Sequence, residues 1–201
     1  MVTWEWTAVV MIGTTRVRAI TLGILPFLFC LISLISTPGC DSGGTNFVGS
    51  GTGGYNTVTS MGITFRWKID GALLRVIVVA PTRGWVGVGF SPSVRMQDAN
   101  IIIGYVIGDK AYVSDEYGDG PTTHQPDVYA NGTDNIIGPT GRERDGSTEL
   151  SFAIPLDSGD ARDRQIVPGH NYTVMLAYGP DTADQFTTRH STRTSICVLF
   201  Q

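Results

Sequence analysis

The chain has 201 residues and a formal net charge of −4, with 16% charged residues and 25 glycines. This length suits one domain of ordinary size, and sparse charge with abundant glycine favours an all-β protein with many tight turns over a helical bundle. Lys and Arg are scattered singly, without a basic stripe interleaved with aromatic residues, so we expect no nucleic-acid partner.

The N-terminal segment has the layout of a secretory signal. Arg16 and Arg18 precede an apolar run at residues 19–35, and small residues then lead to Cys40. A basic start, an apolar centre and a small-residue end define a signal peptide, which we expect at residues 1–39. The protein is therefore expected to be exported to the cell envelope or periplasm.

The end of this segment resembles a bacterial lipoprotein signal, in which the cysteine after a small residue receives a lipid. That pattern usually has an aliphatic residue where this chain has Thr37. We expect a lipid on Cys40 that anchors the protein to a membrane, with simple cleavage or a retained transmembrane helix containing Pro26 as alternatives. The opening residues suit no part of a signal peptide, so translation is also compatible with a start at Met11.

Residues 40–57 are expected to form a flexible tether. They are mostly Gly, Ser, Thr and Asn, which cannot bury enough apolar surface to fold. Of the three cysteines, Cys30, Cys40 and Cys197, the last alone lies in the part expected to fold, so the sequence predicts no disulfide framework. Their spacing also fits no zinc site.

Residues 58–201 show the pattern of short strands separated by turns. Apolar and polar residues alternate from Ile63 to Asp70, which is typical of a strand with one buried face, and Asp70-Gly71 is a strong hairpin signal. Further strands are expected at residues 73–80, 85–90, 100–107, 111–114, 149–154, 172–178 and 195–200. This number and spacing of strands predicts two packed antiparallel sheets, an immunoglobulin-like β-sandwich.

The order of motifs from residue 62 to residue 200 resembles the DOMON family. A Gly-Trp followed by a glycine-interrupted apolar strand (residues 84–91) precedes Met96-Gln97-Asp98-Ala99-Asn100 and a second apolar strand (residues 101–106). Residues 115–117, residues 126–127 and His190-Ser191-Thr192-Arg193 are also similar to the family pattern. Many members have aspartate at the position of Asn100, so local hydrogen bonding there is expected to differ.

The resemblance implies a β-sandwich that binds either haem b or a sugar. Met96 and His190 fall at the positions of the two axial iron ligands of the cytochrome-type members. Trp85, Phe90 and Tyr105 are candidates for an apolar wall, and Arg189 or Arg193 for binding the propionates. The chain lacks a C-x-x-C-H sequence, so any haem is held non-covalently.

Ordinary structural explanations exist for each of these residues. Met96 could plug the open end of the sandwich, and His190 could be a solvated loop residue. Gly87 and Gly89 could let a flat group approach the strand, or mark a bulge. Core packing accounts for the aromatic residues equally well.

Two functions are therefore considered. The first is an electron-transfer module, not an enzyme, that passes single electrons to an unidentified redox partner protein, since an iron with two axial ligands has no open position for a substrate. The alternative is a carbohydrate- or other ligand-binding module without haem, in which Tyr117 and Tyr129 supply aromatic platforms.

An acidic loop offers a separate possibility. Asp115, Glu116, Asp119 and Asp127 lie close together in the sequence, and oxygen-rich loops of this kind can hold calcium. Their spacing fits no EF-hand.

Overall fold

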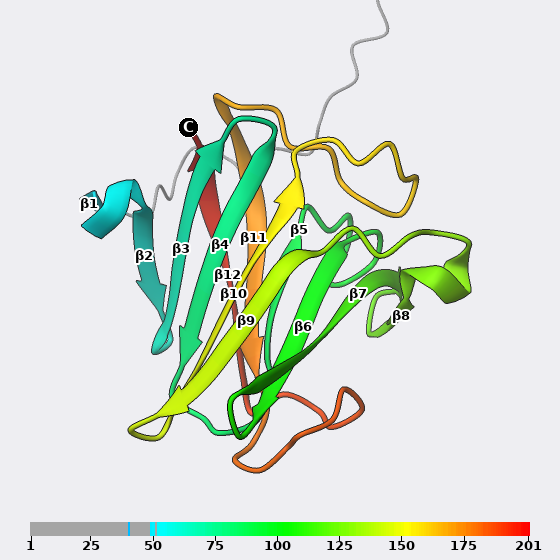
Figure 1. Ribbon diagram of the computed structural model, residues 1–201. Coiled ribbons are helices and arrows are strands. Elements are labelled where there is room, and N and C mark those ends of the chain that lie inside the picture. Colours follow the sequence, from blue (N-terminus) through cyan, green and yellow to red (C-terminus); the bar gives the residue numbers. More distant parts are fainter. Residues whose placement is uncertain (1–39, 41–48, 51) are drawn as a thin grey trace, which may run out of the picture. The chain divides into compact units, whose positions relative to one another are not determined.

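The computed structural model describes residues 40, 49–50 and 52–201 (Figure 1). The expected leader at residues 1–39 and half of the expected tether, residues 41–48 and 51, lie outside the described residues. Within the described part, no helix is long and apolar enough to cross a membrane.

Two six-stranded antiparallel sheets pack face to face, which confirms the predicted all-β sandwich. The first sheet consists, in spatial order, of β1 (Gly49–Ser50), β2 (Asn56–Ser60), β3 (Ile63–Asp70), β4 (Leu73–Ala80), β10 (Ser147–Pro155) and β9 (Ile137–Arg144). The second consists of β12 (Thr192–Phe200), β11 (His170–Tyr178), β5 (Val86–Phe90), β6 (Asn100–Ile107), β7 (Lys110–Gly120) and β8 (Thr123–Pro126). Two short 3-10 helices, η1 (Thr52–Gly54) and η2 (Asp127–Ala130), complete the described elements.

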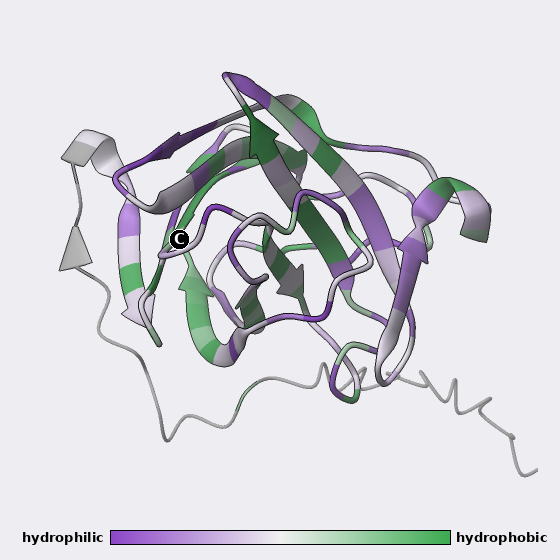
Figure 2. Cartoon of the chain, turned by 90° about the horizontal axis from the view of Figure 1, so that it is seen from below, coloured by the Kyte–Doolittle hydropathy of each residue, from purple (hydrophilic) through white to green (hydrophobic). Residues whose placement is uncertain are grey.

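The main core lies between the sheets and follows the alternation read from the sequence. On β3, Phe65 and Trp67 are fully buried, and the Trp67 ring meets Phe200 of β12 edge to face at 6.0 Å. Aromatic pairs in this geometry add to the free energy gained by burying their surface. Figure 2 shows the resulting separation, with hydrophobic residues on the strands and hydrophilic ones in many of the loops.

The central strands of the second sheet depart from this alternation. All five residues of β5 are buried, as are the first five of β6. Ile102 belongs to the core between the sheets, whereas Ile103 belongs to a second apolar cluster with Trp85 and Ala183. Since neighbouring residues of a strand point to opposite faces, the outer face of this sheet is also covered.

Four strands were not expected from the sequence. β1 and the start of β2 fall within the segment expected to be a tether, and β2 pairs with β3 through Thr57 and Val58. β8 and β9 were missed because most of their side chains are polar or exposed, so neither shows an apolar period of two. Part of the segment expected to be a tether is therefore in paired strands.

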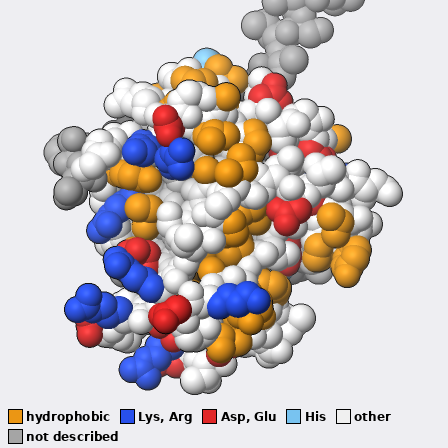
Figure 3. Space-filling view, viewed as in Figure 1, with side chains coloured by type: hydrophobic (Ala, Val, Ile, Leu, Met, Phe, Trp, Pro, Cys, Tyr) orange, Lys and Arg blue, Asp and Glu red, His pale blue; other side chains and the backbone are white. Residues whose placement is uncertain are grey.

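The surface of the domain carries charges of both signs. On the face shown in Figure 3, Lys and Arg side chains lie among Asp and Glu side chains, with apolar groups between them. This interspersed pattern agrees with the sparse, mixed charge of the sequence.

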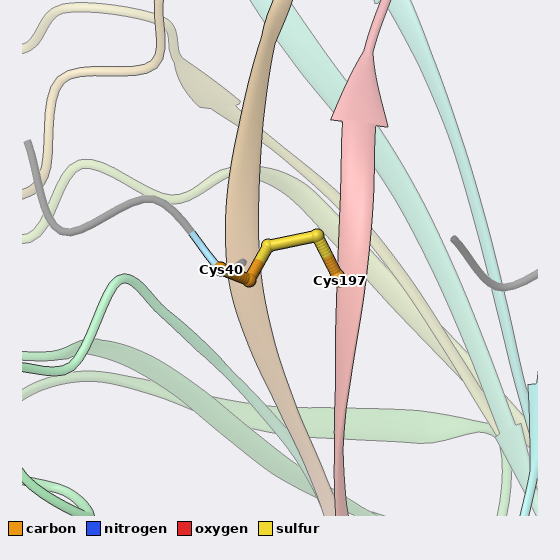
Figure 4. The surroundings of a disulfide bond; sticks show 2 residues. All are labelled: Cys40 and Cys197. Atoms are coloured by element: carbon orange, nitrogen blue, oxygen red, sulfur yellow. A yellow bond between two sulfur atoms is a disulfide. The ribbon is translucent and has the colours of Figure 1, made fainter. Parts of the chain in front are cut away.

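Cys40 forms a disulfide bond with Cys197 on β12 (Figure 4). This pairing corrects two expectations, that the cysteines form no disulfide and that the sulfur of Cys40 carries a lipid, because one sulfur atom cannot form both bonds. The sequence could not show the pairing, since the two residues are 157 positions apart. The bond fixes residue 40 to the second sheet.

We expect the Cys197→Ser substitution to lower the free energy of unfolding by about 3 kcal/mol, because a cross-link across a long loop restricts the unfolded chain. Urea unfolding of the full chain measures this change. Reduction should destabilise the wild-type protein by a similar amount and leave the variant unaffected. Equal midpoints for oxidised wild-type protein and variant would contradict the assignment.

Candidate functional site

A cavity of about 750 Å³ lies on the outer face of the second sheet. Its floor is formed by β5, β6, β11 and β12, through residues that point away from the main core, such as Ile101, Ile103 and Ala177. The remaining wall comes from two loops, residues 91–99 between β5 and β6 and residues 179–191 between β11 and β12, and from the β7–β8 turn. The volume is typical of a site for a small molecule or cofactor.

Met96 and His190 both line this cavity. They come from the two different covering loops, and each is half-buried. Two candidate ligand residues that are far apart in the sequence therefore face one space.

The loop that carries Met96 is held by hydrogen bonds. Asp98 accepts one from the Ser93 hydroxyl at 2.5 Å and one from the Tyr117 hydroxyl at 2.7 Å. These two bonds hold the pKa of Asp98 below its ordinary value. Arg164 adds a third contact by donating its Nε–H to the Asp98 carbonyl oxygen at 2.5 Å. The acidic residue of the Met-Gln-Asp motif thus positions the loop on which Met96 lies.

The same loop rests directly on β7. The Asp98 N–H donates to the Gly118 carbonyl at 2.7 Å, and the Gly118 N–H donates to the Ala99 carbonyl at 2.9 Å. A Cβ atom on Gly118 would lie 1.7 Å from the carbonyl oxygen of Met96. Only glycine leaves room for this approach.

The loop that carries His190 is held by Trp85. The indole Nε1–H of Trp85 donates to the carbonyl oxygen of Thr188 at 3.0 Å, and the Trp85 side chain is buried. A Cβ atom on Gly84 would lie 2.1 Å from the carbonyl oxygen of Pro180, in the same loop. The Gly-Trp pair thus has a physical role. Gly84 leaves room for the loop to approach the strand, and Trp85 holds the loop through a hydrogen bond.

The surroundings of His190 favour a neutral imidazole. Partial burial, followed by the charge of Arg193, lowers the pKa of His190 below its ordinary value. Neutral imidazole is the form that binds metal ions. Arg193, Arg189 and Arg95 also line the cavity.

His124 is a cavity residue that the sequence analysis missed. It lies on β8, lines the cavity and is hydrogen-bonded through Nδ1 to the buried carboxylate of Glu116. No local sequence pattern identifies it, because a four-residue polar edge strand gives no periodic signal. His124 is therefore a second histidine to be tested as a ligand.

The expected aromatic wall is only partly present. Trp85 lines the cavity. The expectation for Phe90 is wrong, since this residue is buried in the core between the sheets, 6.3 Å from the ring of Phe200. Tyr105 lies on the outer face but packs against Tyr112 and Phe186, and of these three rings Phe186 reaches the cavity.

The two glycines of β5 do not mark a bulge, because β5 pairs in continuous register with both β6 and β11. A Cβ atom on Gly89 would lie 2.6 Å from Cε of Met175, so that side chain approaches the strand closely. A Cβ atom on Gly87 would meet ordinary contacts of 3.6 Å or more. Close approach is required at Gly89 and not at Gly87.

Comparison with known proteins agrees with this architecture. The model of the DOMON domain matches residues 60–179, more than half of the chain. The chain belongs to the DOMON domain family. The matched DOMON region includes Met96 and ends before His190.

Two solved structures share the DOMON fold. The cytochrome b domain of pyranose dehydrogenase from Coprinopsis cinerea is 14% identical, with a TM-score of 0.54 over 72% of this chain and 80% of that chain. The cytochrome domain of Myriococcum thermophilum cellobiose dehydrogenase is 11% identical, with a TM-score of 0.53 over 79% of this chain and 90% of that chain. At these identities the likeness shows the fold alone.

We expect Gly118→Ala to displace the Met96 loop and to lower the free energy of unfolding by about 1–3 kcal/mol, as overpacking does elsewhere. Urea unfolding measures the loss, and hydrogen exchange at the Asp98 amide reports the loop. Gly87→Ala is the matched control and should change neither quantity strongly. A protected Asp98 amide in Gly118→Ala would contradict the role given to Gly118.

Proposed function

We propose that this DOMON domain binds haem b non-covalently, with Met96 and His190 as axial ligands, and transfers single electrons. The observation that carries the proposal is that these two residues, from separate loops, line one cavity. The two solved structures described above are cytochrome domains by title, which supports the same function.

The residues of the cavity suit such a group. Apolar side chains, including Ile101, Ile103 and Phe186, provide a dry lining on the sheet side. The exposed guanidinium groups of Arg95, Arg189 and Arg193 provide partners for carboxylates, which guanidinium binds in a bidentate manner. A flat apolar group with acidic substituents matches this combination.

The protein would hold both ligands ready before binding. The Asp98 contacts fix the Met96 loop, and the Trp85–Thr188 hydrogen bond fixes the His190 loop. Haem b with both axial positions filled supplies a one-electron couple, and the methionine raises its reduction potential relative to two histidines. The domain is accordingly proposed as an electron-transfer module for an unidentified redox protein and not as an enzyme.

We further propose that the domain is exported to the cell envelope or periplasm. The signal-like segment at residues 1–39 and the Cys40–Cys197 disulfide support this location, because disulfides persist in oxidising compartments. With the Cys40 sulfur engaged, attachment to a membrane would depend on a retained apolar segment at residues 19–35.

The alternative carbohydrate-binding function receives less support from the loops. Tyr117 donates its hydroxyl to Asp98, and its ring lies under the guanidinium of Arg162, 5.0 Å from the ring centre. Its ring is therefore already covered by a protein group. Tyr129 is 77% exposed and remains available, but one ring makes a small platform.

The test is the absorption spectrum of the chain purified after expression with haem. We expect a Soret band that shifts on reduction, and we expect Met96→Ala or His190→Ala to weaken haem binding at least about tenfold, or about 1.4 kcal/mol. Met61→Ala and His170→Ala are matched controls, because Met61 and His170 are both exposed.

His124→Ala distinguishes the two histidines of the cavity. A spectrum unchanged in His124→Ala and altered in His190→Ala supports the proposed pair. Loss of the low-spin spectrum in His124→Ala alone would transfer the ligand role to His124. A colourless wild-type protein would overturn the haem proposal.

A further inference from the structure

Three carboxylates converge at a place distinct from the cavity. Asp115 lies on β7, Asp127 opens η2, and Asp163 lies in the loop of residues 156–169 between β10 and β11. One oxygen atom from each lies within 4.8 Å of the others. β7 pairs Asp115 with Ile102, a residue of the main core, so Asp115 points away from the outer face that carries the cavity.

Two of these carboxylates, Asp115 and Asp127, are buried and have oxygens without a hydrogen-bond donor among the described residues. Asp127 is 1% exposed, and neither of its oxygens has a partner among the described residues. Asp115 is 4% exposed; its Oδ2 accepts the Asn135 N–H at 2.8 Å, while Oδ1 has no partner within the described part of the chain. Buried polar atoms are almost always paired, and an unpaired buried carboxylate costs several kcal/mol.

A neutral side chain adjoins Asp163. Asn100 is 3% exposed, and its Nδ2 donates to Oδ1 of Asp163 at 2.6 Å. Its own Oδ1 is buried and unpaired with any described residue. This amide is not acidic, so its unpaired oxygen is a sign, independent of the carboxylates, that no described donor reaches this side of Asn100.

The two nearby arginines have their direct partners outside the cluster, and the charge of Arg162 offsets only part of the effect of burial at Asp127. Arg164 pairs with Asp98, and Arg162 donates to the Ala130 carbonyl while its guanidinium covers Tyr117. Burial, together with the nearby charge of Asp163, raises the pKa of Asp115 to about 8 and that of Asp127 to about 7. The unpaired buried oxygens of Asp115 and Asp127 have no described hydrogen-bond donor beside them, and a bound cation would satisfy them.

The donor set selects the class of cation. All of the atoms concerned are carboxylate or amide oxygens, with no histidine or cysteine in the cluster. Zinc favours nitrogen and sulfur ligands. Calcium takes six to eight oxygen ligands in flexible geometry, whereas magnesium demands near-ideal octahedral geometry and retains several waters. Oxygens from separated segments in a closely packed interior suit calcium better.

We propose that Asp115, Asp127 and Asp163, with the side-chain oxygen of Asn100, bind a Ca²⁺ ion. The ion links β6 and β7 to η2 and to the loop of residues 156–169. Its binding does not depend on haem, because the site lies on the opposite side of the second sheet from the cavity.

The test uses the full chain, stripped of metal with EDTA and free of haem. We expect calorimetric titration to give one Ca²⁺ per chain, and saturating Ca²⁺ to raise Tm by at least about 5 °C. Absence of both effects would overturn the proposal. An equal rise in Tm with Mg²⁺ at the same concentration would overturn the choice of calcium.

Asp127→Asn removes one charge with little change of shape. We expect it to weaken Ca²⁺ binding at least about 100-fold, and to leave the metal-free protein no less stable than metal-free wild type, since an unpaired buried charge is lost. Asp119→Asn is the matched control, an exposed carboxylate on the same strand. Wild-type calcium affinity in Asp127→Asn would contradict the site. If Asp127→Asn does not fold, Asp163→Asn gives the same comparison at a less buried position.

Discussion

The outer face of the second sheet has to be covered, because β6 is apolar on both of its sides. Ile102 packs into the core between the sheets, while Ile101 and Ile103 point the opposite way, and all three are buried. In an antiparallel sheet one face is commonly solvated, so a strand of this kind needs a second cover. Here the loops of residues 91–99 and 179–191 provide it, and the cavity is the space that they leave above the sheet.

The two covering loops are held by different means. The Met96 loop is fastened by polar contacts, with Asp98 bound to Tyr117 and to Arg164. The His190 loop is fastened through the sheet itself, because Trp85 is a core residue of the outer cluster and its indole reaches the Thr188 carbonyl. Asp98 thus positions the Met96 loop and Trp85 positions the His190 loop. Substitution of one of these residues should therefore disturb one side of the cavity without the other.

The sequence predicts the half-buried strands of the sandwich better than the edge strands and the contacts between distant segments. The alternation at residues 63–70 identifies a strand because half of its side chains are buried, whereas β9 and β8 bury few and give no such pattern. Phe90 faces the core between the sheets while Gly89 borders the cavity, because neighbouring residues of one strand point to opposite sides. The strand pattern alone therefore argues against Phe90 as part of the cavity wall. The partner of Cys197 and the cavity position of His124 depend on tertiary contacts between segments distant in sequence, which local patterns do not report.

Two neighbouring acidic residues of strand β7, Asp115 and Glu116, belong to different sites on opposite faces of the second sheet. Its alternation sends Asp115 inward, opposite Ile102, and sends Glu116 outward, opposite Ile101, where it pairs with His124 at the cavity. Read along the chain, the two carboxylates look like one cluster. In the fold, one meets Asp127 and Asp163 and the other meets a histidine, so the two carboxylates differ in what can neutralise them. The loop of residues 156–169 contacts both the carboxylate cluster and the Met96 loop. It supplies Asp163 to the cluster, and its Arg164 donates to the Asp98 carbonyl oxygen in the Met96 loop.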